Sequence, residues 1–253
     1  MKTKRRILDA AMVLLLPLLM AYSLIGEAFH EVAGTLMLVL FILHHWLNRK
    51  WWKSLFRGKY SPQRVFQTAL NLLLLLFMIC QPLCGILMSK HLYTFLPTDG
   101  VSSVVRAIHL PLANWGFVLM SLHAGTHLGT ILPKEKKALI FGFLVAISLY
   151  GIYAFFKRQI PAYMFLQLPF AFFDYSEARF FFFVDYIAVM VLFATLGYFL
   201  FQWIGKKPGH RNLRCMMTPE ERTTPASFAP RFSQNAPRFR ALHQALSKNA
   251  PRK

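Results

Sequence analysis

Four histidines in this sequence form two pairs with the same spacing. His30 and His44 lie 14 residues apart in one apolar run, and His109 and His123 lie 14 residues apart in another. On an α-helix, 14 residues turn through roughly 1400°, so the members of a pair lie about 40° apart on one face and about 21 Å apart along the axis. Imidazole is a ligand of iron, and two axial imidazoles leave a haem with no open coordination site. The spacing therefore predicts two electron-carrying haems, one above the other, between two helices.

The runs that carry these histidines are long enough to cross a bilayer. The chain of 253 residues is 56% hydrophobic and 15% charged, and several runs of about 20 residues are nearly uncharged, which is the length that a spanning helix needs. A water-soluble chain would show alternating or amphipathic periods instead. We expect an all-α, polytopic transmembrane helical bundle. Its six predicted spanning helices cover residues 7–26, 29–47, 65–88, 109–132, 138–156 and 182–204.

The net charge of +19 predicts topology rather than nucleic-acid binding. The segments expected inside hold 24 of the 29 Lys and Arg residues and those expected outside hold five, a bias typical of cytoplasmic loops. Six spans place both termini in the cytoplasm, whereas an odd number would put one basic end outside. Residues 157–181, aromatic and interrupted by prolines, are expected to lie along the outer interface.

The chain divides into two parts by composition. Residues 1–204 form the predicted membrane domain. Residues 205–253 are basic and rich in proline, and such a composition cannot bury enough apolar surface to fold alone, so we expect a disordered cytoplasmic tail. A contact with anionic lipid or a partner protein is the alternative for this tail. The three cysteines indicate no disulfide framework.

Helix direction assigns the histidines to two levels. One helix separates the second predicted span from the fourth, so these two run in the same direction. His30 and His109 then lie at the same outer depth, and His44 and His123 lie together at a deeper, inner level. A histidine inside a membrane bundle is a candidate functional residue because it is costly there unless it has a partner.

Further residues on the same two helices are secondary candidates. His127 lies a whole number of turns from the outer histidine of its helix, so it could replace His123 as a ligand or bond a haem propionate. His45 is rotated by about 100° from its neighbour and is expected to meet another helix or the headgroups. Gly34 and Gly116 would admit the edge of a macrocycle, although small residues also ease helix packing.

Charged residues near the outer end are candidates for contacts with a quinone or a partner. They are Asp174, Glu177, Arg179 and Asp185. The alternative is a salt-bridged cap at the membrane interface.

At these positions the chain resembles the flavinylation-associated cytochrome family, a group of small bacterial membrane cytochromes. The resemblance covers roughly residues 7–204 and excludes the tail, and the histidine spacing is shared with ferric reductases and other dihaem membrane cytochromes. The matching features are His30-Glu31 with Gly34, the segment 44–48 with Trp51, the block 109–129, and Phe173-Asp174-Tyr175 followed by Asp185-Tyr186.

The resemblance implies a cytochrome of the bacterial inner membrane with two haem b groups, which transfers electrons beside extracytoplasmic proteins carrying covalent FMN. We expect electrons to pass from a quinol or a cytoplasmic-side donor to such a flavoprotein or another acceptor, a role that the membrane subunit of an oxidoreductase would fill. The sequence predicts no flavin or nicotinamide site, because no G-x-G-x-x-G follows a predicted strand. A haem-free transporter or sensor is the alternative, but transport sites cluster near the midplane rather than at two depths.

Overall fold

The structure is a computed structural model that describes residues 2–96, 102–133, 135–168, 170, 173–174 and 176–205. Every regular element among them is an α-helix, and five of the helices are long and apolar enough to cross a membrane. The prediction of an all-helical, multi-pass membrane protein is confirmed at this level. Residues 206–253 of the predicted tail lie outside the described residues. In chain order the helices are α1 (Lys2–Met20), α2 (Tyr22–Ile25), α3 (Glu27–Leu47), α4 (Arg49–Ser54), α5 (Pro62–Leu87), α6 (Ser102–Ile131), α7 (Lys137–Lys157), α8 (Ile160–Met164) and α9 (Arg179–Gly205).

The five candidate spans are α3, α5, α6, α7 and α9. Four of them begin and end within three residues of the predicted limits. The exception is α6, which starts at Ser102, seven residues before the predicted start at His109. Two helical turns therefore precede His109, because no proline or glycine interrupts residues 102–108.

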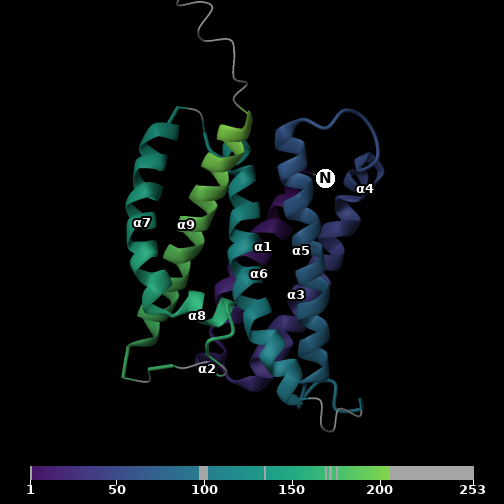
Figure 1. The fold of residues 1–253 in the computed structure, drawn as a ribbon, viewed down its shortest axis with the longest axis vertical. Coiled ribbons are helices and arrows are strands. Elements are labelled where there is room, and N and C mark those ends of the chain that lie inside the picture. The colour runs from purple at the N-terminus through teal and green to yellow at the C-terminus, as the bar shows by residue number, and fades with distance from the viewer. Residues whose placement is uncertain are drawn as a thin grey trace, which may run out of the picture. The chain divides into compact units, whose positions relative to one another are not determined.

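The first predicted span is divided in the structure. The helix α1 ends at Met20, and the short α2 follows after Ala21. Gly26, with a φ of 82°, then turns the chain into α3, a conformation that glycine adopts without steric cost. The five candidate spans do not include α1, whose first half carries Arg5, Arg6 and Asp9. Even so, α1 packs closely against α3 and runs antiparallel to it (Figure 1).

The centre of the helical arrangement is α6. It packs against α5 on one side and α9 on the other, and α7 covers α9 (Figure 1). The N-terminal end of α1, the helix α4, the connection from α6 to α7 and the C-terminal end of α9 gather at one end, whereas α2 and α8 lie at the other. The segments that the charge pattern assigns to the inner side thus share one end of the bundle.

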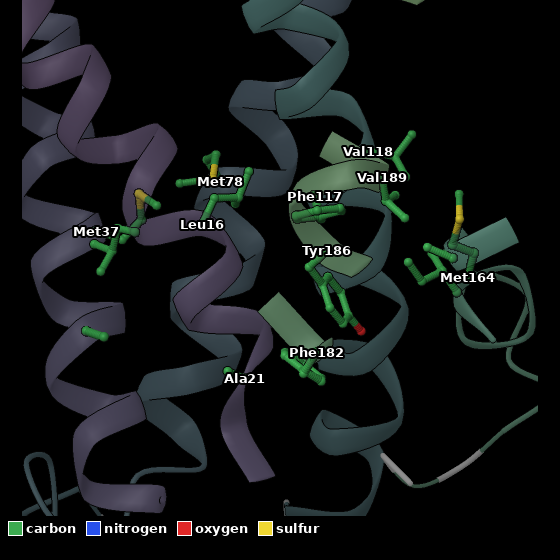
Figure 2. Close-up of a cluster of buried hydrophobic side chains, with 14 residues drawn as sticks. Leu16, Ala21, Met37, Met78, Phe117, Val118, Met164, Phe182, Tyr186 and Val189 are labelled. Atoms are coloured by element: carbon green, nitrogen blue, oxygen red, sulfur yellow. The ribbon is translucent and has the colours of Figure 1, made fainter. Parts of the chain in front are cut away.

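A buried apolar layer crosses the middle of the helices. It brings together Leu16 of α1, Met37 of α3 and Met78 of α5 with Phe117 of α6 and Val189 of α9 (Figure 2). Met37 is seven residues from both His30 and His44, and Phe117 also lies between the two paired histidines of α6. The core therefore separates the outer histidine level from the inner one.

Candidate functional site

The outer pair of histidines meets between two helices that are not in close contact. Among the described residues, α3 and α6 are not a closely packed pair, yet the ring centres of His30 and His109 lie 6.3 Å apart. Metal–imidazole bonds are about 2 Å long and the ring centre lies roughly 1 Å behind the nitrogen, so rings on opposite sides of one metal have centres about 6 Å apart. The observed distance suits one metal ion between the two rings.

Neighbouring residues of α5 hold the ring of His109. The amide N–H of Gln81 donates to Nε2 of His109 over 3.1 Å, and a Cβ at Gly85 would lie 3.8 Å from Cε1 of the same ring. Nδ1 of His109 and Oε1 of Gln81 are both buried with no hydrogen-bond partner. Rotation of the amide would pair Oε1 with an Nε2–H group and leave the lone pair of Nδ1 for a metal. Nδ1 of His30 is also buried without a partner.

The loop after α5 is anchored beside the outer pair. The carboxylate of Glu31 accepts hydrogen bonds from the Ser89 hydroxyl (2.6 Å) and from the backbone N–H groups of residues 90–92 (2.8, 3.2 and 2.9 Å). The Lys90 ammonium also donates to Glu27 over 2.6 Å, which raises the pKa of Lys90. These bonds fix the loop to the first turns of α3, where His30 lies.

The inner level is a cluster rather than a single pair. His123 lies within electrostatic range of His127, His44, Asp9 and His45. The close ring contacts are within each helix, with ring centres 5.0 Å apart for His123 and His127 and 5.6 Å apart for His44 and His45. Nδ1 of His123 is buried without a partner, as at the outer level. The structure therefore brings the predicted ligands to one level.

Asp9 holds the ring of His44. Nδ1 of His44 lies 2.8 Å from a carboxylate oxygen of Asp9 in α1. Histidines that bind metals commonly donate their other ring N–H to a carboxylate, which fixes the tautomer. If Nδ1 donates to Asp9, the lone pair of Nε2 remains available. Nε2 has one long contact, 3.5 Å to the amide of Asn48.

The two secondary histidines have different surroundings. The amide of Gln67 lies 3.4 Å from Nε2 of the exposed His127, whereas His45 packs edge-on against Phe41 and lies 5.6 Å from the ring of Trp52 in α4. A cavity of about 140 Å³ opens beside Gln67. It is lined by Trp51, Ser54, Leu55, Arg64, Gln67 and Thr68.

Asp9 and the two glutamines were not among the residues predicted from the sequence. Gln67 and Gln81 lie 14 residues apart on α5, the same interval as the histidine pairs, and each meets a histidine of α6. The repeated 14-residue interval could have predicted the two glutamines from the sequence. The lone carboxylate of Asp9 in an apolar run could likewise have marked Asp9 as a candidate.

Open space lies beside two glycines of the histidine-bearing helices. A Cβ added at Gly34 or at Gly116 would meet no atom within 4 Å, even though Gly116 itself is buried. A flat group could use this space on both helices.

The number of protein ligands favours a porphyrin over a bare metal ion. No three His, Cys, Asp or Glu side chains of the described residues surround one metal position. A bare zinc site needs three or four protein ligands, whereas a haem brings its own four nitrogens and takes only axial ligands. Paired imidazoles with buried, unpartnered nitrogens therefore fit haem.

The predicted outer charged residues do not form one group. Asp185 is fully buried and accepts hydrogen bonds from Tyr150 (2.5 Å), Lys157 (2.9 Å) and Arg158 (2.7 Å). Glu177 accepts from the same two cations over 2.6 and 2.5 Å, and these bonds hold the pKa of Glu177 below its usual range. The two carboxylates are thus joined to two cations in a single ion-pair network.

The other two members lie outside this network. Asp174 accepts hydrogen bonds from the hydroxyl and backbone N–H of Ser176, which lower its pKa, and Arg179 is exposed at the start of α9. A role for any of the four in contacting a quinone or a partner stays a prediction.

Comparison of the chain with models of protein families, with curated proteins and with solved structures gives no significant match. The resemblance to the flavinylation-associated cytochromes therefore stays a prediction.

Proposed function

We propose that the chain transfers electrons across a membrane through two b-type haems, each held by two histidines. The outer ligands are His30 and His109, and the inner ligands are His44 and His123. The observation that carries this proposal is the outer pair, in which two rings from loosely associated helices lie 6.3 Å apart with buried, unpartnered nitrogens.

The protein supplies the ligands and a dry, apolar surrounding. Each haem, when bound, would accept and release one electron without an open site for oxygen. The apolar layer that contains Met37 and Phe117 keeps water from the space between the two levels. At the inner level we prefer His123 to His127, because Nδ1 of His123 is buried and unpartnered, whereas His127 is exposed.

The proposed topology has six spans, with α1 as the first. Its support is the course of α1, which runs the length of α3 from the basic end of the bundle. The positive-inside rule then places both termini and α4 in the cytoplasm, in the inner membrane of a bacterium. The donor is a quinol or a cytoplasmic-side protein, and the acceptor is an extracytoplasmic flavoprotein or another redox protein. This choice of partners rests on the sequence resemblance.

Haem quantification by pyridine haemochrome on the purified protein tests the proposal. We expect two haems per chain in the wild type and one each in His30→Ala and His123→Ala. The exposed His91 of the loop gives a matched control, because His91→Ala should retain both haems. Unchanged haem content in His30→Ala and His123→Ala would overturn the ligand assignment. A wild-type protein without a Soret band would favour the haem-free transporter or sensor.

A further inference from the structure

The two histidine levels differ in the charge of the side chain that is hydrogen-bonded to a proposed histidine ligand. At the inner level a carboxylate, Asp9, bonds Nδ1 of His44 over 2.8 Å. At the outer level a neutral amide, Gln81, bonds His109 over 3.1 Å. Glu31 adjoins the outer pair, but its oxygens bond residues 89–92 of the loop rather than an imidazole.

The contact between Asp9 and His44 is selective. Arg5 and Arg6 lie within one helical turn of Asp9 in the sequence, yet the ion pair that the structure gives for Asp9 is with His44 of another helix. A carboxylate in an apolar run is unfavourable in a membrane and is usually tied to a function. Here it reaches one specific ring nitrogen.

A carboxylate and an amide affect an imidazole ligand differently. A carboxylate that accepts the ring N–H increases the basicity of the other nitrogen, and hydrogen bonding beyond the ligand tunes the potential of a bound metal. A more basic ligand stabilises ferric over ferrous iron. A charge-assisted hydrogen bond is also about twice as strong as a neutral one.

We infer that Asp9 is a positioning residue that lowers the reduction potential of the inner site below that of the outer site. This inference rests on the proposed function. An electron shared between the two sites then resides mainly at the outer one. Asp9 thereby favours movement of electrons from the basic end of the bundle toward the end that carries α2 and α8.

Spectroelectrochemical titration of the purified protein tests this inference directly. The variant Asp9→Asn keeps the shape of the side chain and removes its charge, so it should raise one of the two midpoint potentials and leave the other unchanged. We expect a roughly tenfold change in the ratio of oxidised to reduced haem at a fixed potential, which is about 59 mV for a one-electron couple. Gln81→Glu places a carboxylate at the outer site and should lower the midpoint potential of that site, which is the one that Asp9→Asn leaves unchanged.

Glu135→Gln is the control for charge alone. Glu135 is exposed in the connection from α6 to α7, at the same end as the start of α1, so this variant removes the same charge at the same end of the bundle. It should shift neither midpoint. An equal shift in Glu135→Gln and Asp9→Asn would show a general charge effect and overturn the inference.

The remaining outcomes separate the inference from the proposed function. Two haems with unchanged midpoints in Asp9→Asn would overturn the role of Asp9 and leave the proposed function standing. If Asp9→Asn loses a haem, the test passes to the Gln81→Glu variant. A lowered midpoint potential of its outer site supports the inference, and an unchanged one overturns it. A wild-type protein that binds no haem refutes the proposed function itself.

Discussion

Gly125 of α6 lies directly against the backbone of Ala194 in α9. A Cβ at Gly125 would overlap the carbonyl group of Ala194, and a Cβ at Gly197 would likewise overlap the carbonyl of Leu122. Two glycines thus let α6 and α9 approach closely, as small residues do at helix crossings in membranes. The opposite condition holds at Gly116, where a Cβ would meet nothing. One side of α6 is therefore fixed against α9, and space remains elsewhere on the helix.

Gly125→Ala should destabilise the protein, because the added methyl group would force α6 and α9 apart. Overpacking of this kind costs about 1–3 kcal/mol. Thermal unfolding in detergent measures the effect. Gly142→Ala is the matched control, since a Cβ at Gly142 has open space and alanine is the better helix former. Equal unfolding temperatures for the two variants would contradict the close approach of α6 and α9.

Gly116→Leu should lower haem content without unfolding the chain. A Cβ at Gly116 meets no atom within 4 Å, so the added side chain should compete with the proposed haem for this space. We expect loss of about one haem per chain, measured by pyridine haemochrome, with unchanged helix content. Gly142→Leu, on α7, should keep both haems. Full haem content in Gly116→Leu would mean that no haem edge uses this space.

The helices were largely predictable because the length of an apolar run limits where a spanning helix can begin and end. This reasoning placed α3, α5, α7 and α9 well, but it placed the start of α6 at His109 because residues 102–108 are too polar to count as span. A helix that extends beyond the hydrocarbon layer keeps its hydrogen bonds without being apolar, so hydropathy does not report its true end.

The candidate site was only partly predictable. Spacing along a helix puts His30 and His44 on one face, but a contact such as Asp9 with His44 depends on how α1 is rotated against α3. Nothing in the local sequence reports that rotation. The same holds for Arg158 and Asp185, which are far apart in the chain and meet only after the segment around α8 folds back.

Glu31→Ala should loosen the loop that follows α5. The backbone N–H groups of residues 90–92 would lose their common acceptor, and each exposed hydrogen bond of this kind contributes about 0.5–1.5 kcal/mol. Hydrogen exchange at residues 89–92 should become faster, and the unfolding temperature should fall. Glu27→Gln removes the exposed charge contacts with Lys90 and His91 and should change stability by less than about 1 kcal/mol. Unaltered exchange in Glu31→Ala would refute the anchoring role.

The ion-pair network at Glu177 should make stability depend on pH in acid. Hydrogen bonds from Lys157 and Arg158 hold the pKa of Glu177 below its usual range in the folded protein. The unfolded chain therefore binds a proton more readily, so the stabilisation is complete above about pH 5 and is lost as the pH falls through the folded pKa. Glu177→Gln should cost about 1 kcal/mol near neutral pH, and this cost should shrink as the pH falls below about 5, because the wild type loses the same interaction when Glu177 is protonated. Unfolding temperatures measured from pH 3 to pH 7 give the comparison, with Glu135→Gln as the exposed control. A constant difference between wild type and Glu177→Gln over this range would contradict a lowered pKa, because only titration of Glu177 makes the difference depend on pH.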